Sequence, residues 1–207
     1  MPVTLQNISD AAITETGRSD KTALADRMAA HGVMLAHSLD YFPQDRQEDN
    51  NVLPSSAAAT MTKALPTRFR KFSLIEPLQS TGIRYAVGAK RVFVEKDPSA
   101  IFSFEGELIK EYYYIQGSNV FLESVDTINR LRWLWYQYPD LSSMSNYTWL
   151  TEKYKNELID FVCYHIYRRE GDEKRASGYL EAWKGNPRVG IIGHMQRIIN
   201  ENLLAEL

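Results

Sequence analysis

Few residues in this chain are able to do chemistry, and their spacing does not build a familiar catalytic or metal site. The 207 residues include four histidines and one cysteine, Cys163. The histidines are His31, His37, His165 and His194. None of them occurs in the HxH, HxxxH or HExxH spacing that brings two imidazoles to one metal, and one thiol does not complete a zinc framework. Cys163 and His165 lie two positions apart in a helical pattern, so they point to different sides and do not form a nucleophile and base pair.

Phosphate-cradling and nucleophile motifs do not occur in the sequence either. Gly185, Gly190 and Gly193 lack the Lys-Ser/Thr continuation of a P-loop, and Gly-x-Ser-x-Gly is absent. Adjacent carboxylates such as Asp172 and Glu173 are typical of solvated turns. We therefore expect no enzymatic activity, no cofactor and no metal.

Two short basic clusters leave a nucleic-acid hypothesis open. One is Arg68, Arg70 and Lys71 around Phe69 and Phe72, and the other is Arg168, Arg169, Lys174 and Arg175. Basic residues interleaved with aromatic ones bind single strands in some proteins, so a single-stranded nucleic-acid-binding module is one alternative. Neighbouring acidic residues and a net charge of −2 favour salt-bridged or interface charge instead.

Tyrosine and tryptophan concentrate between positions 112 and 154. Along a strand Tyr113 faces opposite to Tyr112 and Tyr114, so both faces of this segment carry aromatic rings. In the helical run that follows, the apolar sector covers more than half of the circumference, which is typical of a helix buried on two sides. These patterns predict a subunit interface. Its candidate residues are Tyr112, Tyr113, Tyr114, Trp133, Trp135, Tyr136, Ile159, Cys163 and Ile166.

Helical elements must position these residues at both ends of the chain. In Met1–Phe42 we expect a first helix that ends at Gly17 and a second helix with an apolar stripe. That stripe consists of Leu24, Met28, Leu35, Leu39 and Phe42. In Tyr147–Leu207 we expect one helix over Tyr147–Arg169, capped by Ser145 or Asn146, a second that Asp172 caps, and a third over about residues 189–204.

The central region, Pro66–Pro139, reads as β-rich. Strands are expected at residues 68–75, 82–87, 91–96, 101–106, 111–116, 120–124 and 131–138. The second and third of these are expected to pair as a hairpin, and the set predicts a small antiparallel sheet or sandwich. Pro43–Leu65 is polar and rich in small residues, which predicts a long loop.

These regions together predict an α+β fold in one domain over residues 1–207. An α-helical bundle from 1–42 and 147–207 would carry the antiparallel β-rich insertion 66–139. The sequence starts without a basic, apolar leader, and no apolar run approaches the ~20 residues of a membrane helix. We therefore expect a protein made in a reducing cytoplasm, with no membrane partner.

Four stretches, in this order, carry a resemblance that covers most of the chain. They are TETGRSDKTALADRMAAHGVMLAHSLDYFP, LPTRFRKFSLIEP, KEYYYIQGSNVFLES and WLTEKYKNELIDFVCYHIYRREGDEKRASGYLEAW. This arrangement resembles the head–tail connector (adaptor, or neck) proteins of tailed bacteriophages. The resemblance implies a helical bundle with a β-rich insertion and a ring of about twelve copies beneath the portal.

The same resemblance implies partners and a location. Expected partners are further copies of the chain, the portal protein, a tail or nozzle protein, and double-stranded DNA that passes without sequence specificity. The location would be the neck of a virion assembled in the host cytoplasm. The segment after Gly185 would dock on the portal, through Ile191, Ile192, Met195, Ile198, Ile199 and Leu203. Another neck or tail protein, such as a tail terminator or completion protein, is the nearer alternative.

Overall fold

The chain folds into two compact units, one helical and one built of strands. The computed structural model describes residues 1–52, 58–79, 81, 92–97, 111–185 and 190–193. The helical unit combines Met1–Gln44 with Tyr138–Leu207, and the β unit is Asp45–Gln137. The expected α+β class is confirmed, and the β unit interrupts the helical unit in sequence.

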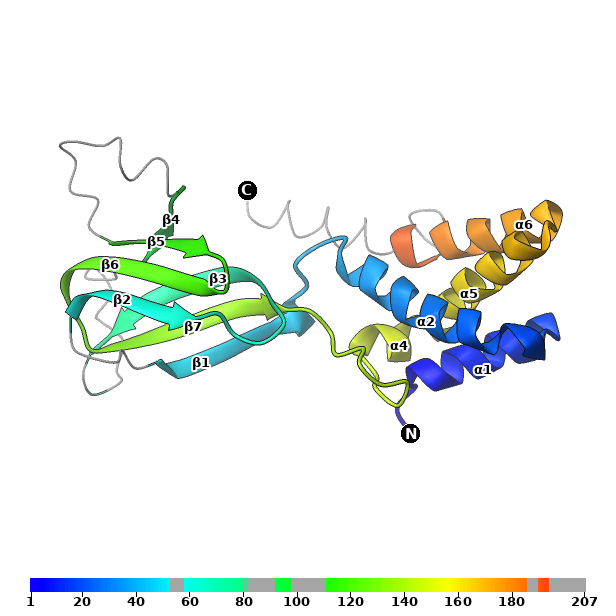
Figure 1. The fold of residues 1–207 in the computed structure, drawn as a ribbon, viewed down its shortest axis with the longest axis horizontal. Coiled ribbons are helices and arrows are strands. Elements are labelled where there is room, and N and C mark those ends of the chain that lie inside the picture. Colours follow the sequence, from blue (N-terminus) through cyan, green and yellow to red (C-terminus); the bar gives the residue numbers. More distant parts are fainter. Residues whose placement is uncertain (53–57, 80, 82–91, 98–110, 186–189, 194–207) are drawn as a thin grey trace. The chain divides into compact units, whose positions relative to one another are not determined.

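The helical unit is formed by elements from both ends of the chain (Figure 1). They are α1 (Leu5–Thr16), η1 (Ser19–Lys21), α2 (Thr22–His37), α4 (Trp149–Lys153), α5 (Lys155–Glu170) and α6 (Glu173–Lys184). Thr4 and Asn7 form a capping box at the start of α1. The helix ends at Gly17, which adopts the left-handed φ of 67° that glycine tolerates, as predicted.

The buried face of α2 differs from the predicted stripe. Its buried residues are Ala25, Ala29, Gly32, Val33, Ala36 and His37. Leu35 and Leu39 are instead exposed, at 36% and 37%. An ideal Cβ at Gly32 would lie 2.8 Å from Cδ1 of Phe161, so the small residues let α2 approach α5 closely. The predicted stripe is right for the buried Phe42 and for Leu24 and Met28, which pack against the core. It is wrong for Leu35 and Leu39, because close packing of α2 on α5 selects for small side chains on the buried face.

The predicted helix over Tyr147–Arg169 is two helices. Tyr154, with φ −126° and ψ 39°, separates α4 from α5. The cap of α4 is Thr148 rather than Ser145 or Asn146, since its hydroxyl accepts from the amides of Leu150 and Thr151. Asp172 caps α6 as predicted, by accepting from the amide of Arg175.

The segment before α4 also completes the N-terminus of α1. The amide of Leu5 donates to the carbonyl of Asn146 at 3.0 Å, and that of Gln6 donates to Met144 at 2.9 Å. These are amides of the first helical turn, which have no partner within their own helix. The two ends of the chain are therefore joined by backbone hydrogen bonds as well as by the apolar core.

The β unit contains two sheets. Its strands are β1 (Arg46–Val52), β2 (Ala58–Ala64), β3 (Phe69–Leu78), β4 (Val94–Glu95), β5 (Glu111–Gln116), β6 (Asn119–Ile128) and β7 (Arg130–Gln137). One sheet has the order β1-β7-β3 and the other β2-β6-β5-β4. Neighbours pair antiparallel, except that β4 is parallel to β5.

The loop predicted over Pro43–Leu65 is wrong for most of its length. Both β1 and β2 lie within it, after the short 3-10 turn η2 (Pro43–Asp45). The β-rich part therefore begins near Asp45 instead of Pro66. Strands at 82–87 and 101–106, the predicted hairpin and the end of the last helix after Gly193 fall on residues outside the described ones.

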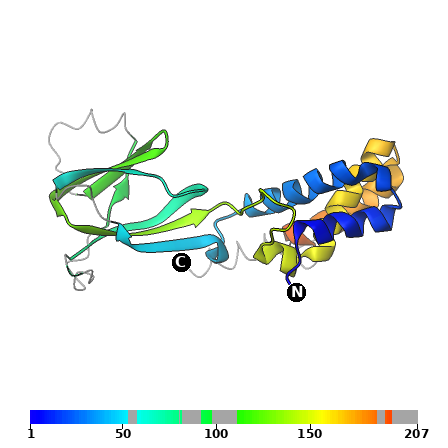
Figure 2. The same ribbon diagram turned by 60° about the horizontal axis from the view of Figure 1, so that its bottom comes forward.

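The two sheets enclose one core (Figure 2). Phe72 lies in its middle, with ring centroids 5.5 Å from Tyr113 of the opposite sheet and 5.2 Å from Trp133 of its own. At one edge Arg132 of β7 donates to Glu48 of β1 at 2.6 Å and to the buried Glu76 of β3 at 2.8 Å. This cation ties the three strands of its sheet together.

The chain enters and leaves the β unit at neighbouring positions. Arg46, at the start of β1, is the register partner of Tyr136, near the end of β7. Paired residues of an antiparallel ladder lie roughly 5 Å apart. The two connections to the helical unit therefore start from the same end of one strand pair.

Candidate functional site

Cys163 is placed where it has no access to a reactant. It is fully buried, and its thiol lies 4.0 Å from the carbonyl of Ala12. Burial first, and then the charges of Glu15 and Asp160, raise the pKa of this thiol to about 12. Such a thiol is protonated and unreactive at neutral pH.

The histidines do not converge on a metal geometry. His31 and His165 both lie near Phe161, with ring centroids 5.9 Å and 4.6 Å from it. His37 is buried and meets Trp149 edge-on. Among the described residues, no three or more His, Cys, Asp or Glu side chains are close enough together to hold a metal ion.

The aromatic strand β5 alternates as predicted. Tyr113 is buried in the core of the β unit, whereas Tyr112 and Tyr114 are half-buried on the outer face. Tyr114 stacks on Phe121 with centroids 4.9 Å apart. The Tyr112 hydroxyl donates to Glu123, and burial followed by this hydrogen bond raises the Tyr112 pKa to about 12. The outer face is thus apolar in part, and its Tyr112 hydroxyl is engaged by Glu123.

The nine candidate interface residues are divided between the two units. Six belong to the β unit, and Ile159, Cys163 and Ile166 belong to α5 of the helical unit. Those three, together with Tyr113 and Trp133, are buried within their own units. The prediction that these side chains need a neighbouring subunit to cover them is therefore wrong for these five. In the helical unit α1 and α2 cover the residues of α5, and in the β unit the facing sheet covers Tyr113 and Trp133.

The apolar surface that remains exposed in the helical unit was not predicted as an interface. Among the described residues of this unit, the exposed large side chains are Met1, Leu35, Leu39, Tyr41, Tyr138 and Tyr147. Leu35, Leu39 and Tyr41 lie within seven residues, at the end of α2 and just after it. The sequence does contain a signal for this exposed surface: the opposite face of α2 is rich in alanine. Close packing of that face would have predicted that Leu35 and Leu39 are exposed. We call Leu35, Leu39 and Tyr41 the α2 apolar face.

The portal-docking residues are only partly within the described chain. Ile191 is fully buried in the helical core, and Ile192 packs against that core. Met195, Ile198, Ile199 and Leu203 lie outside the described residues. Docking through Ile191 would therefore require it to leave its own unit.

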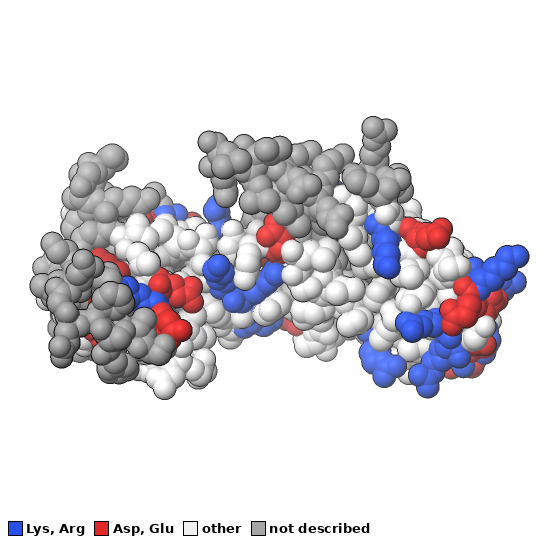
Figure 3. Space-filling view, turned by 90° about the horizontal axis from the view of Figure 1, so that it is seen from above, with Lys and Arg blue, Asp and Glu red and all other residues white. Residues whose placement is uncertain are grey.

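In the first basic cluster the aromatic rings contact one another. Phe72 is buried, and Phe69 packs against it in a tilted arrangement with ring centroids 4.6 Å apart, so these rings face the protein and not a base. Arg168 and Arg169 lie toward α2, whereas Arg175 pairs with Asp172 at 3.5 Å and covers Tyr167. On the face shown in Figure 3, charged side chains of both signs gather over the helical unit.

No described helix has the length and apolar character that crossing a bilayer requires. A comparison with protein-family models and one with curated proteins found no match to this chain.

Proposed function

We propose that this protein is a structural, non-enzymatic component of a tailed-bacteriophage virion, a head–tail adaptor that forms a ring under the portal. One observation carries the proposal: both ends of the chain build one helical unit, and a two-sheet β unit is inserted between them. This is the organisation that the resemblance of the sequence to connector proteins implies. In this role the ring links the portal to the tail or nozzle and extends the channel through which double-stranded DNA passes.

The α2 apolar face is the surface that we assign to contacts between neighbouring copies. Leu35 lies in the last turn of α2 and Leu39 in the turn that follows, while the opposite face of α2 is already packed on α5. Exposed leucines and a tyrosine next to one another are typical of a surface that a partner covers. A ring made of identical copies uses one such face on every subunit.

The proposal is tested by co-expression with the portal protein encoded in the same genome. Mass photometry and electron cryomicroscopy of the purified portal should then show an added ring of this chain. A chain that stays monomeric and never joins a portal ring contradicts the proposal. Binding to the end of a tail tube, without binding to the portal, assigns the chain as a tail terminator or completion protein instead.

A Leu35→Ser/Leu39→Ser variant tests the α2 apolar face. Because both side chains are exposed in the single chain, the variant should keep its Tm. Loss of two buried leucines at each contact, about 1.5–3 kcal/mol apiece, should lower ring formation by more than about tenfold. Val94→Ser, an exposed apolar residue of the β unit, is the matched control and should leave assembly unchanged.

Truncation after Gly193 tests portal docking by the C-terminal segment. This cut keeps Ile191 and Ile192 in the core, whereas a cut after Gly185 removes them. The cut after Gly193 should abolish portal binding with little loss of stability. The cut after Gly185 should abolish portal binding and also destabilise the helical unit. Unchanged portal binding after the cut at Gly193 would show that the portal-docking surface does not include the segment after Gly193.

A further inference from the structure

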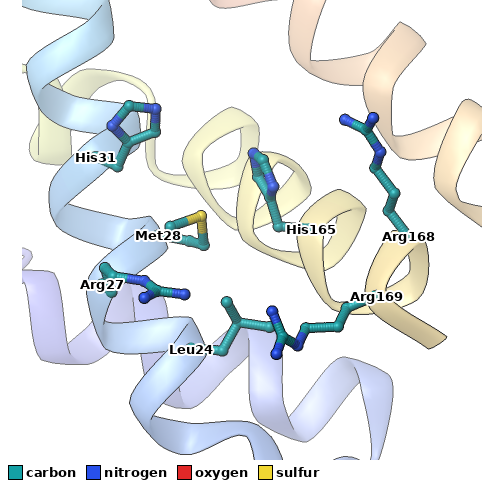
Figure 4. Close-up of a pocket in the computed structure, with 7 residues that line it drawn as sticks. All are labelled: Leu24, Arg27, Met28, His31, His165, Arg168 and Arg169. Atoms are coloured by element: carbon teal, nitrogen blue, oxygen red, sulfur yellow. The ribbon is translucent and has the colours of Figure 1, made fainter.

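A basic hollow lies on the helical unit between α2 and α5 (Figure 4). Its volume is about 540 Å³. Leu24 and Met28 of α2, both half-buried, contribute apolar surface to it. Its other contributors are cationic or ionisable: Arg27, His31, His165, Arg168 and Arg169. No carboxylate is among the described residues that line it.

Two arginines from different helices point toward one another across this hollow. Figure 4 shows the guanidinium groups of Arg27 and Arg169 directed into the space beside Leu24. Within the described part of the chain, neither makes a salt bridge. Facing like charges raise the free energy of the empty site, and an anion between them removes that cost.

Acidic residues stand next to both arginines in the sequence, and both are engaged elsewhere. Asp26, which precedes Arg27, accepts a hydrogen bond from the Ser9 hydroxyl at 2.6 Å. Glu170, which follows Arg169, pairs with Arg18 and with Lys21, the latter at 3.0 Å. These two cations hold the pKa of Glu170 below its usual range. Glu170 is therefore committed to the turn between α1 and α2 and does not neutralise the hollow.

Of the remaining groups in the hollow, Arg168 adds a third permanent positive charge. The Arg168 guanidinium is held by Tyr164, to whose hydroxyl it donates at 2.8 Å. Burial, followed by the charges of His31 and Arg168, lowers the pKa of His165. This shift favours the neutral imidazole of His165, a hydrogen-bonding group beside the three arginines of the hollow.

We propose that this hollow binds the phosphate group of a phosphate ester, between Arg27 and Arg169. Guanidinium forks match the oxygens of phosphate bidentately, and a phosphate carries enough charge and acceptors for two of them. The organic part of the ester lies on Leu24 and Met28. The phosphate belongs either to a free nucleotide or to the backbone of a nucleic acid. The inference does not depend on the proposed role in the virion.

The test uses the full chain and follows the ring resonances of its four histidines by NMR. Inorganic phosphate, a nucleoside monophosphate and a short duplex oligonucleotide are added separately, at low and at physiological salt. Binding in the hollow should shift His31 and His165 and leave the buried His37 unchanged. A response to the monophosphate identifies a free ester, whereas a strongly salt-dependent response to the duplex alone identifies the nucleic-acid backbone.

Matched variants locate the phosphate. Arg27→Gln/Arg169→Gln should weaken binding by about tenfold or more, since each loses a charge-assisted hydrogen bond. Both side chains are exposed, so the fold should be unaffected, which circular dichroism checks. Lys174→Gln/Arg175→Gln changes the net charge equally, elsewhere on the helical unit, and should leave the affinity within about twofold.

Three results would overturn the inference. They are no histidine shifts with any of the phosphate probes, equal weakening by the two double variants, and stronger binding of an acidic peptide than of every phosphate probe. The last result would reassign the hollow as a docking site for carboxylates of a protein partner.

Discussion

Cys163 shows how much the surroundings of a single residue decide what it can do. In the sequence it is a lone thiol on an apolar helix, and in the structure it is fully buried against α1 with a pKa of about 12. We predict that a thiol reagent such as DTNB labels the folded chain more than about 100-fold slower than the urea-unfolded chain. Rapid labelling of the folded monomer would contradict this prediction and would show that Cys163 is accessible to solvent.

Asp160 lies in surroundings that disfavour the charged form of its carboxylate. Burial, and then the charges of Glu15 and Glu157, raise its pKa from 3.8 to about 6. Because the folded-state pKa is the higher one, the stabilisation from its proton is complete below pH 3.8 and is lost as the pH rises through 6. Asp160→Asn should therefore raise the free energy of unfolding at pH 7 by about 1–2 kcal/mol, a figure reduced for solvent screening.

Urea unfolding at pH 7 and pH 4 measures the Asp160 effect. The gain from Asp160→Asn should shrink toward zero at the lower pH, where the folded wild-type residue is already protonated. Glu152→Gln, an exposed carboxylate of α4, serves as the control and should change stability little at either pH. An equal gain at both pH values would show that charge is not the cause.

Residue patterns predicted the direction of side chains within one element better than they predicted contacts between residues distant in the sequence. Alternation along β5 correctly assigned Tyr113 to the face opposite Tyr112 and Tyr114, since the two-residue period is a property of the strand alone. The hollow with Arg27 and His31 was not foreseen, because more than 130 positions separate these residues from His165 and Arg169. Only the packing of α2 on α5 brings them together.

At the scale of elements, the contact between α2 and α5 depends on Gly32. A Cβ there would lie 2.8 Å from a ring carbon of the buried Phe161, which itself packs against Trp183. Gly32→Ala should therefore destabilise the chain by about 1–3 kcal/mol, as overpacking does, despite the better helix propensity of alanine. Thermal unfolding measures the change.

Gly178 of α6 is the matched control for Gly32. A Cβ at this position would have no neighbour within 4 Å, and the residue is exposed. Gly178→Ala should raise stability by about 0.5–1 kcal/mol through helix propensity alone. If the two alanine variants behaved alike, close packing at Gly32 would not be the reason for its glycine.

The strands that sequence patterns missed have a physical explanation. The β1 sequence RQEDNNV is polar and contains residues that strands disfavour, so neither alternation nor propensity marks it. It becomes a strand because β7 pairs with it from Arg46 to Asp49 and again at Val52, at the edge of a sheet. Helix ends marked by Gly17 and Asp172 were predicted, because caps are local in sequence.

At the scale of the whole molecule, the insertion of the β unit predicts that the helical unit folds without it. Since Arg46 and Tyr136 are register partners, a short Gly/Ser linker can join Gln44 to Tyr138 in place of Asp45–Gln137. The resulting protein should be helical by circular dichroism and should unfold cooperatively. Its core residues come from α1, α2, α5 and α6, which are all retained.

A fragment containing only Tyr138–Leu207 is the control for this excision. It lacks α1 and α2, so Phe161 and Cys163 lose the surfaces that bury them. We expect it not to fold cooperatively. If the linked helical protein were equally unfolded, the two units would depend on one another for stability.

The neighbouring ends of β1 and β7 also determine how the β unit would respond to force. Tension applied through its two connections acts at Arg46 and Tyr136, at the same end of an antiparallel pair. Such a load opens the ladder one hydrogen bond at a time instead of shearing many bonds at once. The β1–β7 pair is thus the place where we expect the strands of the β unit to begin to separate under load.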